Sequence, residues 1–477
     1  MSLPTNPRTT NTGVLMAALL AACLAFQLNA SMLSPALVSI ERQLRATAPE
    51  VAATQTAFFT AAALFSLFLP RLADILGRRR VLALSLLAMA VGCVVAALAP
   101  NIGVLFAGRV LQGASGPVIP IALVMLRAAV PDPKRYGTLM GVVAAINGGI
   151  AGFDALLGGY LVTHHGFASI FWTMAAVAVV AAAAVRLLTP ESFAKDRRRL
   201  DVGGSVLLVV AVGAALVCIN EVGRLGDANP ALVGGTAVLA AAGAIAFWQV
   251  EKRHAAPLVP VTQLRERSTW ALVATTTLTL GGVFAIMNGL LPALAQDDSL
   301  GYQLDAEAVS ALVLTPYAVA GLLVGPLSGR LAATIGYRTM LRVGIGGAAV
   351  GLVGIMSGVG GTSPVFLFAV AVWVGVTYAG IANIMLNGLG IVLSPADRPG
   401  SLPGLNTGAF NIGAGLSFVV VYAVQAAAPT GDGPTLGYVA GTAAGVLLLV
   451  GAFLMSFAVP RPTSAEAATS APVGAHS

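Results

Sequence analysis

Charged residues are scarce in this chain. Asp, Glu, Lys and Arg together make up 9% of its 477 residues, whereas a soluble domain carries about 25%. Hydrophobic residues make up 57%, so the few charges cannot form a polar surface over them. This composition excludes a soluble globular protein and predicts a chain that crosses a membrane many times.

Residues that form disulfides or bind metals are also few, with three cysteines and four histidines. Cys23, Cys93 and Cys218 are far apart and lie in apolar stretches, a spacing that fits neither a disulfide framework nor a metal site. His164 and His165 fall in a short predicted loop. The patterns His-x-x-x-x-Asp and Asp-x-Asp, typical of membrane acyl and glycosyl transferases, are missing from the sequence. We therefore expect no metal, no cofactor and no enzymatic activity.

The chain instead contains fourteen apolar runs, each near the length of about 20 residues that a helix needs to span a bilayer. Backbone polar groups in hydrocarbon must be bonded within their own segment, so the runs are predicted to be helices. They lie near residues 14–36, 52–70, 81–100, 103–126, 138–162, 168–188, 203–222, 231–249, 270–294, 308–328, 341–359, 364–386, 405–428 and 436–458.

Basic residues are distributed unevenly between the two sides of the predicted membrane. Of 26 Lys and Arg residues, 22 fall on the side of Arg78–Arg80, while Arg42, Arg45 and Arg224 fall on the other side and Arg109 lies within a run. The positive-inside rule then places both termini in the cytoplasm of a multi-pass protein of the inner (plasma) membrane. The same bias explains the net charge of +7 without a nucleic-acid partner.

A short segment between two runs is repeated at half-chain distance. Pro70–Leu82 (PRLADILGRRRVL) has a degraded copy at Gly329–Leu341 (GRLAATIGYRTML). Such a repeat predicts two homologous helix bundles, separated by two inserted helices. The predicted units are a cytoplasmic N-terminus (1–12), a six-helix bundle (13–188), a linker with the inserted helices (189–268), a second six-helix bundle (269–458) and a disordered cytoplasmic tail (459–477).

At these residues the chain resembles the major facilitator superfamily, and within it the fourteen-helix drug:proton antiporter family. The first copy of the repeat matches the family's loop motif at Leu72, Ala73, Asp74, Gly77, Arg78 and Arg79. The family's fourth-helix motif is matched by Leu105, Arg109, Gln112 and Gly113, and part of its fifth-helix motif by Gly158 and Gly159. Two positions differ: Asp154-Ala155 stands in place of Gly-Pro, and Asn29 in place of an acid in the first helix.

The resemblance implies a transporter whose two halves rock around one site. In the family's pattern the acid of the loop motif lies against a helix of the other half. Asp74, with Gly77, Arg78 and Arg79, is therefore expected to form a conformational latch that favours the outward-facing state. The alternative is that the arginines only set the topology.

Arg109 and Asp154 are charges inside predicted helices, both roughly 12 Å below the external surface at 1.5 Å per residue. Charges at that depth nearly always have a partner or a water-filled cavity. One interpretation makes Asp154 the proton-binding acid, with Arg109 modulating its ionisation. The other is a permanent ion pair that holds the two helices together.

Polar residues in the runs are candidates to face a central substrate cavity: Gln27, Asn29, Asn147, Asn288, Tyr317, Asn383, Asn406 and Asn411. Asparagines in membrane helices also bond neighbouring helices. From the motifs we expect a monomeric, proton-coupled antiporter for multidrug efflux, and hence antibiotic resistance, with a small lipophilic molecule, protons and the bilayer as its partners. The alternative is a facilitator or proton symporter that carries a small metabolite on the same fold.

Overall fold

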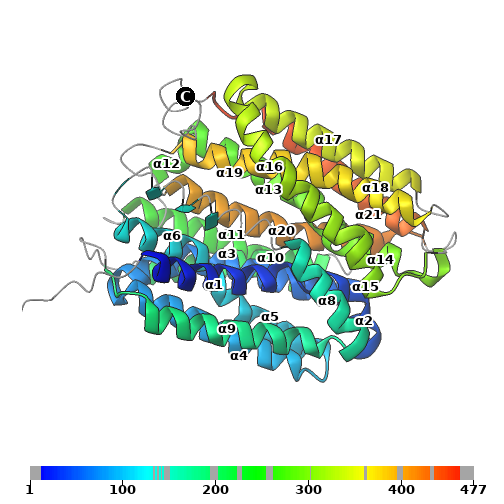
Figure 1. Cartoon of the computed structure of the whole chain (residues 1–477), viewed down its shortest axis with the longest axis horizontal. Coiled ribbons are helices and arrows are strands. Elements are labelled where there is room, and N and C mark those ends of the chain that lie inside the picture. The colour runs from blue at the N-terminus through cyan, green and yellow to red at the C-terminus, as the bar shows by residue number, and fades with distance from the viewer. Residues whose placement is uncertain are drawn as a thin grey trace, which may run out of the picture.

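The computed structural model describes residues 12–130, 132, 135–136, 139–140, 142–143, 151–193, 202–222, 228–253, 261–300, 302–358, 363–394, 401–429 and 435–461. Its regular elements are all helices (Figure 1). Eleven helical stretches are long and apolar enough to cross a membrane, and α3 (Ala48–Leu76), bent by 44°, adds a twelfth. α8 (Ala151–His165) and α10 (Val202–Val222) stand at the other two predicted runs. The predicted termini, 1–12 and 459–477, lie almost wholly outside the described residues.

The first half of the molecule consists of the helices before the inserted pair. Its elements are α1 (Thr12–Ser31), η1 (Ser34–Ala36), α2 (Leu37–Leu44), α3, α4 (Arg78–Ala97), α5 (Ile102–Gln112), η2 (Gly113–Ser115), α6 (Val118–Ala129), α8 and α9 (Ala168–Leu188). The residues at which some of these helices begin are determined by local capping interactions. Thr47, for example, accepts a hydrogen bond from the backbone N–H of Glu50, whose side chain accepts from Thr47 in return, which is a capping box.

The second half consists of the helices after the inserted pair. After α12 (Val261–Arg265) come α13 (Arg267–Ala285), η4 (Ile286–Leu290), α14 (Leu291–Ala295), η5 (Asp298–Leu300), α15 (Ala306–Val309), η6 (Ser310–Leu314), α16 (Thr315–Ile335), α17 (Tyr337–Gly358), α18 (Pro364–Val374), η7 (Gly375–Ala382), α19 (Asn383–Val392), α20 (Ser401–Ala427) and α21 (Thr435–Met455). The segments η4, η6 and η7 are π-helical turns inside longer helices, a feature frequent at functional sites.

The repeated loop has the same backbone in both halves. Gly77 follows α3 with φ of 107°, and Gly336 follows α16 with φ of 93°. In both loops the glycine N–H bonds the carbonyl four residues earlier, at 3.0 Å. Positive φ strains any residue with a Cβ, which explains why this glycine survives in the degraded copy. The repeat in sequence is therefore a repeat in structure.

The inserted helices α10 and α11 (Pro230–Arg253) pack against each other, and α10 also contacts α3. Only 6% of the most apolar stretch of α11 is buried. An apolar helix with so little buried surface is suited to face lipid rather than a protein core. The inserted pair therefore lies beside the two halves and contributes little to their shared interior. The boundaries predicted for these units stay a prediction.

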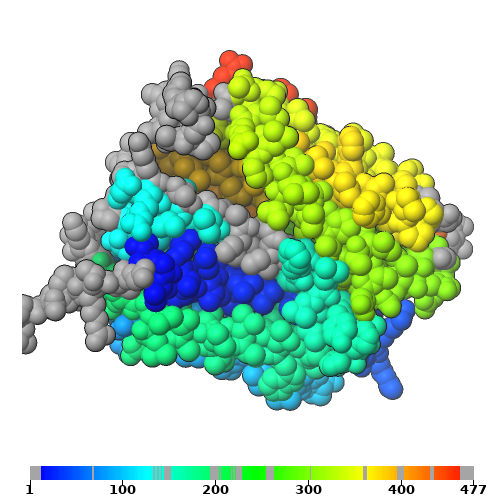
Figure 2. Space-filling view, in the orientation of Figure 1, coloured from blue at the N-terminus to red at the C-terminus, as the bar shows by residue number. Residues whose placement is uncertain are grey.

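The two ends of the molecule differ in charge. We call the end with Arg78–Arg80, Arg253 and Arg338 the basic end, and the end with Asp297, Asp298, Asp305 and Glu307 the acidic end. At the acidic end α8 of the first half packs against α15 and α16 of the second (Figures 1 and 2). An ion pair also joins the halves there, Arg42 to Asp298 at 3.3 Å, and the ring of His164 lies 3.7 Å from the carboxylate of Glu307. The halves are thus closed against each other at the acidic end.

Candidate functional site

The largest fully buried polar group is the guanidinium of Arg109 on α5, with 0% exposure. It donates to the amide oxygens of Asn29 on α1 at 2.7 Å, Gln55 on α3 at 2.6 Å and Gln112 on α5 at 2.6 Å. Its carbon CZ lies 4.3 Å from the ring centre of Phe58, within the range of a cation–π contact. One side chain therefore links three helices of the first half.

Asp154 on α8 is 2% exposed and belongs to a separate polar group. Its Oδ2 accepts a hydrogen bond from Ser31 of α1, and Ser31 accepts one from Gln27 at 2.9 Å. The second oxygen, Oδ1, has no hydrogen-bond partner among the described residues. A buried carboxylate needs a cation or several donors to offset lost hydration, and the described surroundings supply no cation, only the hydroxyl of Ser31 and the backbone of Ala155.

Arg109 and Asp154 form no ion pair in the described part of the chain. The interpretation of a permanent pair is therefore wrong for this conformation. The physical reason is that neutral amide oxygens satisfy Arg109, while Ser31, two residues beyond Asn29 on α1, binds Asp154. Whether Asp154 carries a proton stays a prediction.

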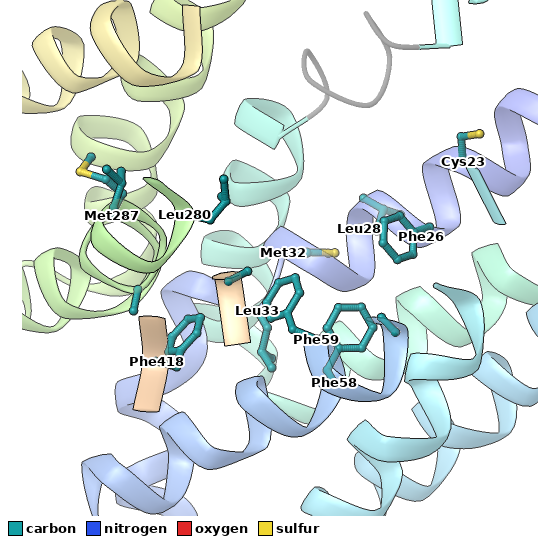
Figure 3. Packing of buried hydrophobic residues seen from close by; sticks show 14 of the residues in the cluster. Cys23, Phe26, Leu28, Met32, Leu33, Phe58, Phe59, Leu280, Met287 and Phe418 are labelled. Carbon is teal, nitrogen blue, oxygen red and sulfur yellow. The ribbon is translucent and has the colours of Figure 1, made fainter. Parts of the chain in front are cut away.

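Aromatic side chains connect the Arg109 group to the second half. Phe58 contacts Phe59 with ring centres 4.9 Å apart, and Phe59 meets Phe284 of α13 edge to face at 5.0 Å. Phe284 in turn contacts Phe410 and Phe418 of α20 at 6.0 and 6.2 Å. Figure 3 shows Phe58 and Phe59 where the halves meet, with Phe418 on the side of the second half. These rings form an apolar contact between the halves near the middle of the helices.

The charged residues of the loop motif form ion pairs and hydrogen bonds within their own half. Asp74 accepts from Arg78 at 2.7 Å, and Arg79 lies 3.5 Å from Glu191, whose carboxylate also accepts the backbone N–H of Arg79 at 2.9 Å. Arg79 further donates to the carbonyl of Thr189 at 3.4 Å. The arginine thus ties α4 to the segment after α9. No described residue of the second half pairs with Asp74, so the latch stays a prediction.

Glycines explain how the acidic end closes. A Cβ at Gly159 of α8 would lie 2.6 Å from the carbonyl oxygen of Ala306 in the second half and still closer to Ser310. A Cβ at Gly158 would collide with the carbonyl of Met32 in its own half. The Gly158–Gly159 pair therefore gives α8 two close neighbours, one in each half.

The predicted cavity asparagines do not share one environment. Asn29 binds Arg109, and Asn288 donates to the carbonyl of Phe284 at 3.0 Å and accepts from Ser34 of the other half at 3.4 Å. Asn383 accepts from Asn387 one turn along α19, at 3.1 Å. None of these three amides is left entirely without a protein partner.

The remaining candidates for the cavity also lie in different environments. Asn406 accepts from Thr276 at 2.6 Å and donates to the carbonyl of Leu386 at 3.2 Å, so it joins three helices. Tyr317 stacks nearly parallel to Tyr378, with ring centres 6.4 Å apart. The amide nitrogen of Asn411 has no partner in the described part of the chain. Asn147 lies outside the described residues.

We expect the substitution Asn406→Leu to lower thermal stability. It removes two interhelical hydrogen bonds of α20, each worth about 1 kcal/mol in a membrane protein. The measurement is thermal unfolding of the purified protein in detergent, with Thr236→Ala on lipid-facing α11 as the control. An unfolding temperature equal to that of the wild type would show that these bonds do not stabilise the fold.

Sequence reasoning missed several members of the site. Gln55 and Ser31 bind the two buried charges, and Glu191 binds Arg79. Gln55 and Ser31 were identifiable as polar residues in apolar runs. Their partners were not, and Glu191 carried no sequence signal because Arg79 is 112 residues away. A polar pocket of about 480 Å³ at the acidic end, lined by Arg42, Asp298 and Asp305 among others, was also not expected.

Two repeated helical halves, buried polar groups within the helices and close contact of the halves at the acidic end are features of a membrane transporter. Residues 19–418 match the model of the Major Facilitator Superfamily, and the chain belongs to this superfamily. A uridine/deoxyuridine transporter of Lactococcus lactis is 52% identical over 451 residues, covering 94% of each chain. The multidrug resistance protein Stp of Mycobacterium tuberculosis is 27% identical over 405 residues, 84% of this chain and 73% of the relative.

Solved structures agree on the fold. The human organic anion transporter MFSD10 has a TM-score of 0.61 at 15% identity, covering 95% of this chain and 100% of that one. The nucleoside transporter NupG has a TM-score of 0.59 at 14% identity, covering 92% and 99%. The expected architecture, a major facilitator fold with two six-helix bundles and two inserted helices, is confirmed, and the chain is a multi-pass membrane protein.

The expectation of drug efflux is wrong. The relative at 52% identity is a uridine/deoxyuridine transporter, whereas the multidrug protein shares 27%. The matches establish the superfamily but not its fourteen-helix drug:proton antiporter family. Multidrug efflux, antiport and antibiotic resistance thus find support in distant relatives alone. The motifs misled because the loop and fourth-helix motifs identify the superfamily, and the relatives of this chain include both a nucleoside transporter and a multidrug protein.

Proposed function

We propose that this protein transports pyrimidine nucleosides, uridine and deoxyuridine, across the plasma membrane by alternating access. The observation that carries the proposal is the 52% identity to a uridine/deoxyuridine transporter over 94% of both chains. The site is compatible with such a cargo, because its described polar groups are mainly amides and hydroxyls. These groups match a neutral solute rich in hydrogen-bond donors and acceptors.

The test of this proposal is uptake of radiolabelled uridine by a bacterial host that lacks its own nucleoside transporters. We expect uptake well above that of cells with an empty vector, and competition by excess unlabelled deoxyuridine. Uptake at the level of the empty vector, with the protein verified in the membrane, would overturn the proposal. The same cells report direction, because an exporter would lower the uridine content of preloaded cells.

Within this proposal, the conformation of the protein corresponds to one state of the transport cycle. With the basic end and both termini in the cytoplasm, as the charge distribution predicts, closure at the acidic end is what an inward-facing state requires. The pairing of Asp74 with Arg78 in its own half is then expected, because a latch between the halves at the basic end would be released. In the outward-facing state Asp74 would instead approach the second half.

We further propose that Asp154 couples nucleoside entry to protons. It is the one acid in the described part of the first half that is buried without a cation, and proton binding would remove its uncompensated charge. A path for that proton runs past Ser31, which links Asp154 to Gln27 of α1.

Replacing Asp154 with asparagine is expected to separate accumulation from exchange. Asparagine keeps the size and a hydrogen-bonding group but cannot bind and release a proton. Wild-type cells should accumulate uridine and lose it when a protonophore is added. The variant should only equilibrate uridine, with exchange of internal for external uridine retained. A variant that still accumulates uridine, in a protonophore-sensitive way, would exclude Asp154 as the coupling acid.

A further inference from the structure

One side of α20 changes its surroundings along its length. Gly404, Gly408, Asn411 and Gly415 are spaced by four, three and four residues, which places them on the same face of a helix. At Gly415 this face is packed, since a Cβ there would lie 3.4 Å from the Cβ of Phe59 and 3.5 Å from the hydroxyl of Thr60 on α3. At Gly408 and Gly404, nearer the basic end, no described atom lies within 4 Å of that position.

Asn411 lies at the boundary between the packed and the open part of this face. It is 2% exposed, yet its amide nitrogen Nδ2 has no hydrogen-bond partner in the part of the chain that the structure describes. Leaving a buried donor unpaired costs about 1–3 kcal/mol. Such a group in a native protein calls for a specific explanation, such as a water or a ligand in another state.

Asn406, five residues away on the same helix, is an asparagine that holds neighbouring helices together. Its oxygen accepts from Thr276 and its nitrogen donates to the carbonyl of Leu386. The same residue type on one helix thus has two different roles. Both the oxygen and the nitrogen of Asn406 bond to protein, whereas Asn411 keeps a donor without a described partner, about one turn from the open position at Gly408.

The first half contributes a hydroxyl to this face of α20, about one turn from Asn411 at Gly415. Thr60 is 8% exposed, and the packing at Gly415 places its Oγ1 against the face of α20 that also carries Asn411. Asn411 and Thr60 come from opposite halves. A molecule bound at the end of the open face could therefore contact both halves at once, as a site for alternating access requires.

We propose that Asn411 recognises the uracil ring, through a hydrogen bond from Nδ2 to a ring carbonyl and one from the ring N3–H to Oδ1. This inference rests on the proposed nucleoside transport and deepens it. A carboxamide presents one donor and one acceptor side by side, and the uracil edge presents the complementary carbonyl and N–H. Thr60 would add a contact from the first half, so that the nucleoside is held where the two halves meet.

The experiment compares uridine with 3-methyluridine, in which a methyl group replaces the N3 hydrogen. KM values for both are measured by uptake in the wild type, Asn411→Leu and the matched variant Asn406→Leu. We expect the wild type to prefer uridine by about tenfold or more, since one hydrogen bond is lost and its partner is left buried. In Asn411→Leu the KM for uridine should rise about tenfold and the preference should nearly vanish. Asn406→Leu should lower the amount of folded protein but keep the preference.

Each outcome bears on a different claim. Wild-type protein that does not carry uridine at all refutes the proposed function. Two results refute the role of Asn411 and leave the proposed function standing. One is wild-type protein that carries uridine and 3-methyluridine equally well, and the other is an Asn411→Leu variant that keeps the wild-type preference. If Asn411→Leu does not reach the membrane, Asn411→Ala is compared in the same way, and an unchanged preference there overturns the inference.

Discussion

Substituting Gly159 with valine is expected to lower uridine uptake by a factor of about 5 to 150 without reducing the amount of protein. The site on α8 has no room for a side chain, because a Cβ would lie 2.6 Å from the carbonyl of Ala306 in the second half. Overpacking of this kind costs about 1–3 kcal/mol. The cost arises only when α8 and α15 are together, so it penalises the state closed at the acidic end. A penalty of that size shifts an equilibrium by the stated factor.

The shift can be observed directly with a cysteine reporter. Ser34 is buried at the acidic end, where it donates to Asn288 of the other half. In a Cys218→Ala background, Ser34→Cys should react slowly with a membrane-impermeant maleimide, and faster once Gly159→Val is added. Gly235→Val is the matched control, because no described atom lies within 4 Å of a Cβ on that lipid-facing glycine. Equal labelling with and without Gly159→Val would show that the contact does not govern closure.

Arg109→Ala should reduce uptake to background, the largest effect expected of any substitution here. Removal of the guanidinium breaks three hydrogen bonds of 2.6–2.7 Å and leaves three buried amide oxygens without that donor. Each hydrogen bond to a charged group contributes about 1.5–3 kcal/mol. The sum, roughly 5–9 kcal/mol by the same principle, is comparable to the whole stability of a domain. The arrangement of α1, α3 and α5 should therefore be lost.

Three variants distinguish a structural loss from a purely functional one. Arg186→Ala removes an exposed arginine of the same half and should transport normally. Arg109→Lys keeps the charge but cannot reach three acceptors in one plane, so it should be recovered in the membrane yet remain impaired. The measurements are uptake, the amount in the membrane and thermal unfolding. Wild-type uptake by Arg109→Ala would show that the three-helix link is dispensable.

Much of the architecture could be predicted from sequence because membrane helices are specified locally. A run of about 20 apolar residues must bond its own backbone in lipid, so each of the fourteen runs predicts its helix without reference to the others. The structure of the repeated loop could be predicted for a similar reason. Its glycine must adopt positive φ, and both Gly77 and Gly336 do so. The π-helical turns of the second half were not predictable in this way, since they depend on packing between helices.

The candidate site was less predictable because its partners are distant in sequence. Arg109 and Asp154 were identified as buried charges at similar depth, which made an ion pair plausible. Depth along two helices does not specify rotation about their axes, and that rotation points Arg109 at amides and Asp154 at Ser31. The substrate was misjudged for another reason: the recognised motifs identify the superfamily, and relatives with different substrates match this chain.

Composition and run length by themselves determined that this is a helical membrane protein, because an uninterrupted apolar run of about 20 residues in lipid bonds its own backbone as a helix, and the repeated loop indicated two related halves. Tertiary structure alone decided which of the described asparagines bond neighbouring helices and which keep an unpaired amide group. Asn406 and Asn411 are the same residue type on one helix, and no local pattern separates them. Only the positions of α13 and α19 beside α20 give Asn406 its partners, while the donor of Asn411 has none in the part of the chain that the structure describes.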